Sequence, residues 1–143
     1  MQKWLTRRGM FVGCVLGLAT SAQAAIPATW LAPISGAWTE AANWSTAPHY
    51  PDNGQPPGVD YDVTLAAAGT FHSVSLSTDI TVSSLRLDSL LALLDQSAGD
   101  VTVLGPVAVD AGFYRLSGGS LHVGGSLVAT LAGIATVGAL RSR

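Results

Sequence analysis

Three aspartates recur at nearly constant intervals and could together bind a cation. Asp60, Asp79 and Asp100 each precede a short apolar i, i+2 pair, and Ser120 takes the same place before the next pair. If these pairs stack at the ~4.8 Å spacing of neighbouring strands, the carboxylates form a ladder and repel one another by about 1 kcal/mol per pair in water. Backbone N–H groups in Asx turns would relieve that repulsion, and this is the favoured interpretation. A bound Ca²⁺, which prefers hard oxygen ligands, is the alternative and the single cofactor considered.

Two further acids, Asp88 and Asp110, are expected on adjacent repeats about 5 Å apart, as in the carboxylate pair of a retaining glycosidase. Ordinary turn aspartates are the competing interpretation. A lyase acting on acidic sugars would need basic groups beside the substrate carboxylate. Between the N-terminal segment and the last three residues, Arg86 and Arg115 are the only basic residues, and the expected register puts them on different faces. The pattern therefore argues against such a lyase more strongly than against a glycosidase.

The histidines do not form a zinc motif, because His49, His72 and His122 are far apart and none shows i, i+4 spacing. Acids near His49 could make a hard-metal site, although solvated loop carboxylates are the simpler interpretation. These acids are Asp52, Asp60 and Asp62.

Aromatic residues and prolines crowd residues 30–60. Trp38, Trp44 and Tyr50 could form a platform on which sugar rings stack, which would make the chain a carbohydrate-binding module. Prolines in this segment argue against central strands, because proline lacks the N–H that a ladder needs. The first turn of a repeat also needs a cover over its core. We therefore favour a Trp- and Pro-rich N-terminal cap over a platform.

The elements that would position all these residues are short strands in a repeat of about 20 residues. Val, Thr, Ser, Leu and Gly alternate so that every second side chain faces one side. Three apolar strands per repeat predict an all-β fold, a short right-handed parallel β-helix (β-solenoid) with inward aliphatic columns. An antiparallel β-sandwich is the alternative. The first series is Tyr61/Val63, Ile80/Val82, Val101/Val103 and Leu121/Val123; the second is Leu85/Leu87, Val107/Val109 and Leu127/Ala129; the third is Val74/Leu76, Leu91/Leu93 and Tyr114/Leu116.

The N-terminal segment has the features of an export signal in the usual order. A basic region is followed by an apolar core too short to span a bilayer and by an A-x-A cleavage motif. These parts are Lys3, Arg7 and Arg8, then residues 10–19, then residues 22–24. Cleavage between Ala24 and Ala25 is expected, by either the general or the twin-arginine route. The only cysteine, Cys14, lies inside this segment, so the exported chain would depend on packing and backbone pairing rather than disulfides.

The expected exported chain is acidic. From Ala25 onward it has nine acidic residues, four arginines and no lysine, a net charge of −5. Nucleic-acid binding requires clustered basic residues that displace phosphate counterions. The charge pattern therefore excludes nucleic acid as the expected partner.

Several segments resemble the beginning of large exported bacterial repeat proteins. They are residues 36–45 (GAWTEAANWS), 50–54 (YPDNG), 61–65 (YDVTL), 81–87 (TVSSLRL) and 113–121 (FYRLSGGSL). Proteins of this kind often end in a PEP-CTERM sorting signal and are similar to the strand-repeat regions associated with autotransporters. The resemblance covers roughly residues 36–126 and implies a parallel β-helix, export and a surface or matrix role, with no catalytic residues. The C-terminal residues depart from it, because no Pro-Glu-Pro precedes the weakly apolar run.

These observations divide the chain into an export signal (1–24), a cap (25–60), solenoid coils (61–126) and a further coil or weakly apolar tail (127–143). The coil is favoured because Leu127 and Ile134 would point inward. We expect a secreted or cell-surface, non-enzymatic structural module, a fragment of a larger surface or matrix protein. Polysaccharide or other surface proteins are the expected partners, no membrane anchor is assigned, and open strand edges predict edge-to-edge self-association. A carbohydrate-binding module and a glycoside-active β-helix enzyme are the alternatives.

Overall fold

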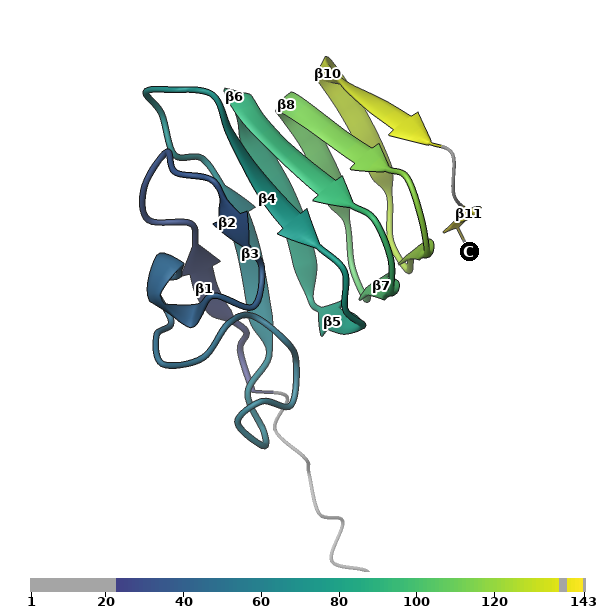
Figure 1. The fold of residues 1–143 in the computed structure, drawn as a ribbon. Coiled ribbons are helices and arrows are strands. Elements are labelled where there is room, and N and C mark those ends of the chain that lie inside the picture. The colour runs from purple at the N-terminus through teal and green to yellow at the C-terminus, as the bar shows by residue number, and fades with distance from the viewer. Residues whose placement is uncertain (1–22, 137–138, 143) are drawn as a thin grey trace, which may run out of the picture.

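Parallel strands stack along one axis in the computed structural model, which describes residues 23–136 and 139–142 (Figure 1). Most of the expected export signal lies outside the described residues. The expected cleavage point lies within them, and there Ala24 is exposed and Ala25 is half-buried. Within the described residues, every pairing between named strands is parallel, and the one antiparallel contact is an isolated bridge between Trp30 and Trp44. The β-solenoid is therefore confirmed, and the antiparallel sandwich is wrong.

Two sheets build the solenoid. The four-stranded sheet contains β5 (Ile80–Val82), β7 (Asp100–Val103), β9 (Ser120–Val123) and β11 (Ala139–Ser142), and we call it the first face. The seven-stranded sheet contains β1 (Ile26–Thr29), β2 (Gly36–Ala37), β3 (Tyr61–Leu65), β4 (His72–Leu76), β6 (Ser84–Gln96), β8 (Val107–Leu116) and β10 (Leu127–Thr136). A short 3-10 helix, η1 (Ala41–Asn43), lies in the segment between β2 and β3.

The seven-stranded sheet bends and supplies the other two faces. The first half of β6 pairs with β3 and its second half pairs with β4, so β6 turns a corner within one strand. The strands β8 and β10 follow the same path and are in register with each other, while β6 and β8 shift register at the corner. We call the β3 side the second face and the β4 side the third face. One coil thus crosses three faces before the chain advances to the next coil.

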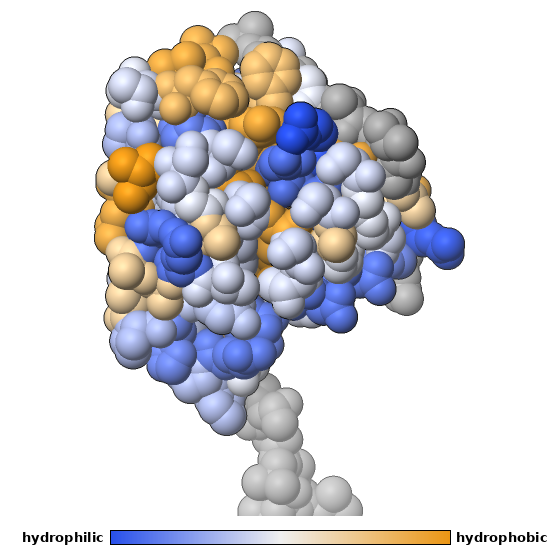
Figure 2. Space-filling view, viewed as in Figure 1, coloured by the Kyte–Doolittle hydropathy of each residue, from blue (hydrophilic) through white to orange (hydrophobic). Residues whose placement is uncertain are grey.

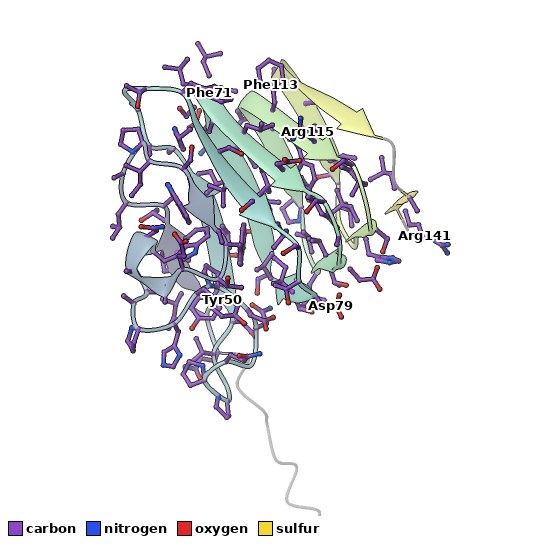
Figure 3. The ribbon with its side chains drawn as sticks, in the orientation of Figure 1. Tyr50, Phe71, Asp79, Phe113, Arg115 and Arg141 are labelled. Atoms are coloured by element: carbon purple, nitrogen blue, oxygen red, sulfur yellow. The ribbon has the colours of Figure 1, made fainter. Side chains whose placement is uncertain are left out.

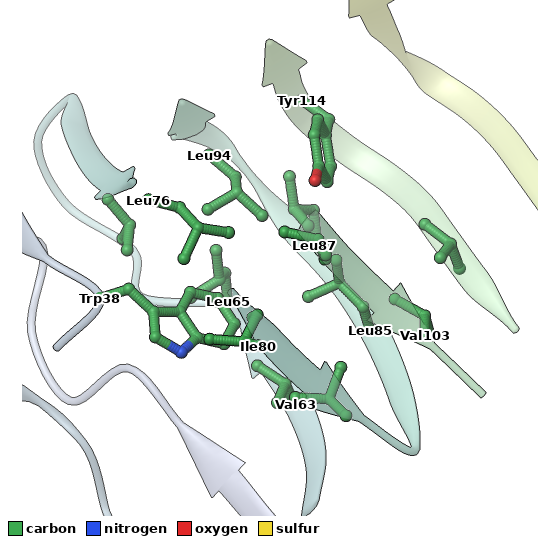
Figure 4. Packing of buried hydrophobic residues seen from close by; sticks show 14 of the residues in the cluster. Trp38, Val63, Leu65, Leu76, Ile80, Leu85, Leu87, Leu94, Val103 and Tyr114 are labelled. Carbon is green, nitrogen blue, oxygen red and sulfur yellow. The ribbon is translucent and has the colours of Figure 1, made fainter. Parts of the chain in front are cut away.

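Most of the expected apolar pairs on the first and second faces form columns, although Ala129, at the end of the second column, is exposed. On the first face Ile80 pairs with Val101 and Val101 with Leu121, and on the second face Leu85 pairs with Val107 and Val107 with Leu127. Each buried aliphatic side chain stabilises the fold by about 1.5–3 kcal/mol relative to exposure. The columns make the core continuous along the axis (Figure 4).

Two expected column pairs are wrong. Tyr61 and Val63 belong to the second face, because β3 pairs with β1 and β6 rather than with β5. Leu91 and Leu93 do not continue the third column, because β6 has extra residues at its corner and the register shifts between Asp88 and Leu93. The inward positions of that column are instead Leu94 and Gln96, both fully buried.

The N-terminal segment begins a partial coil and covers the first end of the core. β1 lies beside β3 and β2 lies beside β4, so strand pairing starts before residue 61. The indoles of Trp30, Trp38 and Trp44 pack edge to face, with ring centroids 5.0 and 4.7 Å apart in the two pairs. Figure 4 shows Trp38 against the aliphatic side chains of the following coils.

Candidate functional site

The expected aspartate ladder exists in part, on the outer edge of the first face. The backbone N–H of Asp100 donates to Asp79 Oδ1 at 2.8 Å, and the Ser120 hydroxyl donates to Asp100 Oδ1. Each carboxylate thus accepts a hydrogen bond from the coil that follows it. The expected Asx turns are therefore replaced by bonds between coils, and these bonds relieve the repulsion between stacked acids.

Asp60 does not belong to this ladder, because it precedes a strand of the second face. The place below Asp79 is taken by a cap segment, in which Asp52 Oδ1 accepts the N–H of Thr81 at 2.9 Å and the Asn53 N–H donates to the Thr81 carbonyl at 2.7 Å. Residues 52–53 therefore stand in for a strand of the first face. The sequence pattern missed them because they have no apolar i, i+2 pair.

The ladder does not gather the ligands of a metal centre. Among residues 23–136 and 139–142, no group of three or more His, Cys, Asp or Glu side chains is placed to hold a metal ion. The acids near His49 in the sequence form no such group among the described residues either. His49 itself is exposed in the cap. Asp62 is engaged elsewhere, since its Oδ1 accepts the Ser84 hydroxyl at 2.6 Å.

Asp100, Ser120 and His122 lie together, but their hydrogen bonds run in the wrong direction for nucleophilic catalysis. His122 Nε2 is 2.9 Å from Ser120 Oγ, and that hydroxyl donates its proton to Asp100. The serine oxygen therefore accepts from the imidazole N–H, whereas an activated serine must donate to an imidazole base. The arrangement is a hydrogen-bonded link between two coils rather than a catalytic triad.

The acid pair of the second face is bridged by an arginine. Arg86 Nε donates to Asp110 Oδ2 at 2.7 Å, and Arg86 Nη2 lies 3.0 Å from Asp88 Oδ2. The guanidinium occupies the space between the carboxylates in which a glycosidic oxygen and a water would lie. The pair is therefore an exposed ion network across two coils.

A second ion pair lies on the third face. Arg115 binds the two carboxylate oxygens of Asp95, which is one coil earlier. The hydrogen bond from Arg115 holds the pKa of Asp95 below its ordinary value, although burial opposes the shift, and the same bond raises the pKa of Arg115. Arg86 and Arg115 lie on different faces, as the sequence predicted.

One polar pair lies inside the core, and the sequence pattern did not predict it. The Tyr114 hydroxyl donates to Gln96 Oε1 at 2.6 Å, while Gln96 Nε2 donates to the carbonyls of Gly99 and Ser120 at 2.8 and 2.9 Å. Both side chains are fully buried, and burial raises the pKa of Tyr114. The group links three successive parts of the chain and leaves no amide atom of Gln96 unpaired.

The sugar-stacking platform is not formed. Trp38 and Trp44 are 1% and 0% exposed, and their indole N–H groups donate to the carbonyls of Pro51 and Trp38 at 2.9 and 2.7 Å. Tyr50 is half-buried and packs against the core. Neither indole has a face open to a ring, so this prediction is wrong for the two tryptophans, and the expected cap accounts for their burial.

His72 and His122 occupy separate environments. His72 is buried on the third face, with Nδ1 donating to the Thr70 carbonyl at 3.0 Å and Nε2 unpaired within the part of the chain that is described. His122 lies on the outer side of the first face, in an open groove of about 770 Å³. The groove is lined by Thr102, Val103, Leu104, His122, Val123, Gly124 and Arg141.

Family models, curated proteins and solved structures give no match to this chain. Over the described residues, none of the helices is long and apolar enough to cross a membrane.

Proposed function

We propose that this chain is an exported, non-enzymatic structural module, a capped β-solenoid that forms part of a larger cell-surface or matrix protein. One observation carries the proposal: its outward acids bind the neighbouring coil. Asp79, Asp100, Asp95 and Asp110 each accept a hydrogen bond from a residue about 20 positions away along the chain. Side chains with this arrangement stabilise the stack, which is what a structural repeat requires.

Export is supported by the N-terminal sequence and by the way the fold is held. The order of basic region, apolar core and A-x-A motif is typical of a cleaved signal. The first strand begins at Ile26, one residue after the expected cleavage point, so removal of residues 1–24 leaves the described strands intact. The same segment contains the only cysteine, and the solenoid is held by ladders and columns without disulfides.

The test of export is the N-terminus of the recovered chain. The full chain with a C-terminal epitope tag is produced in a bacterial host, and mass spectrometry of the exported fraction is expected to find Ala25 as the first residue. A matched variant, Ala24→Arg, should remain unprocessed because the cleavage motif needs small residues. Replacing both Arg7 and Arg8 by Lys separates the routes, since only twin-arginine export should stop. An uncleaved wild-type chain in the cytoplasm would refute the proposal.

The absence of catalysis is tested separately. The exported chain is incubated with neutral and acidic polysaccharides, and reducing ends and unsaturated products are measured over time. We expect none above a heat-treated control. Turnover that disappears in Asp88→Asn/Asp110→Asn, with the circular dichroism spectrum unchanged, would establish a glycoside-active enzyme instead. Because turnover is measured from the sugar products and export from the N-terminus of the recovered chain, the two failures are distinguishable.

A further inference from the structure

Asn53 links the cap to two faces of the solenoid. Its backbone N–H donates to the Thr81 carbonyl of β5 at 2.7 Å. Its side-chain Nδ2 donates to Ser83 Oγ at 3.2 Å, and its Oδ1 accepts the Tyr61 N–H of β3 at 2.8 Å. The segment between η1 and β3, to which Asn53 belongs, reaches the lower end of the molecule, where Figure 2 shows a largely hydrophilic surface. The half-buried side chain is therefore fixed beside solvent.

The residue that follows Asn53 gives this asparagine a particular reactivity. The chain has two asparagines, and only Asn53 precedes a glycine. In such a pair the glycine nitrogen can attack the side-chain carbonyl carbon of asparagine, because glycine has no side chain that blocks the approach. A C–N bond forms, the amide leaves as ammonia with the proton that the attacking nitrogen loses, and a succinimide ring remains. Water then opens the ring to aspartate or isoaspartate. The reaction needs no enzyme and no co-reactant besides water.

The closed cap holds the pair in a geometry that opposes ring closure. The Gln55 N–H donates to the Asp52 carbonyl at 3.0 Å and closes a four-residue turn. Gly54 has φ +85°, whereas Asn53 has no positive φ, so the turn is of type II. The ψ angle of Asn53 in such a turn is about +120°, which directs the Gly54 nitrogen away from the Asn53 side chain. Ring closure therefore requires a large rotation about the Asn53 Cα–C bond, and this rotation would break the turn.

The atoms that would react are also held by hydrogen bonds. The Gly54 N–H donates to the Val59 carbonyl at 2.7 Å, and this bond holds the proton that the attacking nitrogen must lose. The amide group that must turn toward this nitrogen is bound at both ends, by Ser83 and by Tyr61. If two of these bonds open at their ordinary net strength, the reactive form is rarer than the closed form by roughly ten- to a hundredfold. Deamidation in the folded chain therefore requires local opening of the cap.

We propose that Asn53 is a deamidation site that the closed cap protects, and that its conversion permanently releases the cap from β5. The isoaspartate product has one more carbon in its main chain between positions 53 and 54. The carbonyl that accepted the Tyr61 N–H then belongs to the main chain, and a new carboxylate on Cα lies beside Asp52. The type II turn and the two side-chain bonds of Asn53 cannot form in this product.

Release of residues 52–53 would uncover an edge of the first face. Asp52 Oδ1 accepts the Thr81 N–H at 2.9 Å, and the Thr81 carbonyl accepts the Asn53 N–H. Without these partners, the N–H and C=O groups on that side of β5 become an open strand edge. Asp79, which Figure 3 labels, lies immediately before this strand. The change is one-way because the amide is not restored once ammonia has left. It goes beyond the proposed structural role and does not depend on export.

The test of protection compares the folded and unfolded chain. The full chain is incubated at mildly alkaline pH, folded or in urea, and peptide mapping by mass spectrometry measures deamidation at Asn53. We expect isoaspartate and aspartate to form readily in urea and at least about tenfold more slowly in the folded chain. Asn43 is an internal control, because the bulky Trp44 follows it, and it should stay intact in both. Ser83→Ala, which removes the partner of Nδ2, should raise the folded rate alone, whereas Ser117→Ala on the third face should change neither rate.

Hydrogen exchange tests the release of the cap. Chromatography isolates the isoaspartate form, in which amide exchange of residues 80–83 should be faster than in the unreacted chain. Asn53→Asp is the matched control, because it adds the same charge without lengthening the main chain, and it should keep the protection of these amides. Equal deamidation rates in the folded and unfolded chain, or an intact Asn53 in urea, would overturn the proposal. Unchanged exchange in the isoaspartate form would overturn it too, as would an equal loss of protection in Asn53→Asp.

Discussion

Substitution of Gly119 by Ala tests whether close stacking of the coils holds the fold together. Gly119 has φ +74°, and an added Cβ would lie 1.9 Å from the carbonyl oxygen of Gly99, the corner of the coil below. Backbone cannot move aside there without separating the coils. Gly58 is a matched control, with φ +81° and nothing within 4 Å of an added Cβ.

The two variants share one cost and differ in another. An Ala in the left-handed region loses about 1–2 kcal/mol at either position. Gly119→Ala also forces the coils apart, which adds the ~1–3 kcal/mol typical of overpacking. We therefore expect Gly119→Ala to lose about 2–5 kcal/mol of unfolding free energy and Gly58→Ala about 1–2 kcal/mol. Urea unfolding followed by tryptophan fluorescence and circular dichroism measures both.

Equal losses of unfolding free energy in Gly119→Ala and Gly58→Ala would refute the stacking argument. A smaller loss in Gly119→Ala would refute it too, because the steric contact with Gly99 would then be unimportant. A change of m value in Gly119→Ala alone would indicate partial unfolding of the later coils, and tryptophan fluorescence, which reports on the N-terminal cap, would then separate from circular dichroism.

Further predictions concern the buried polar pair, the surface ion pair and the ladder. Tyr114→Phe should cost about 1–3 kcal/mol because it leaves Gln96 Oε1 unpaired, and a double-mutant cycle with Gln96→Leu in urea melts should show coupling. Burial raises the pKa of Tyr114; the folded state therefore holds a proton that the unfolded state loses, so stability should be full below about pH 10 and fall as pH rises, as alkaline urea melts would show. The pKa of Asp95 is lowered from 3.8; the unfolded state binds more protons below that value, so stability should fall as pH drops from about 4 through the folded pKa, and Arg115→Gln should reduce this dependence in acid titrations. The melting temperature should be equal in millimolar Ca²⁺ and in chelator, and a rise with Ca²⁺ that Asp79→Asn abolishes would restore the calcium interpretation.

The sequence was sufficient for the fold because its periodicity arises from stacking itself. In most of the stack, a residue that lies above another resembles it in polarity, so columns such as Ile80, Val101 and Leu121 repeat in the chain at nearly the coil length. The prediction became wrong where the coil length changes. The extra residues at the corner of β6 moved the third column from Leu91 to Leu94, and apolar residues on both sides of the strand hid the shift.

The candidate sites were less predictable because a periodic polar residue reveals neither the face that carries it nor the group that it bonds. Asp60 has the same sequence context as Asp79, yet the cap displaces its strand to another face. Gln96 was unrecognised because its partner, Tyr114, is one coil away and satisfies an amide that would otherwise be costly in the core. A polar residue at a position that the register assigns to the core is the signal that could have found this pair.

Stacking also decides which surfaces remain available for a partner. Each outward acid in a solenoid has a neighbour about 4.8 Å away on the next coil, and it must meet a hydrogen-bond donor or repel that neighbour. Asp79, Asp95 and Asp110 all meet donors from the following or preceding coil, so binding a ligand through them would first require breaking a contact within the fold. An interaction that uses this solenoid without loosening it is therefore expected away from these paired acids.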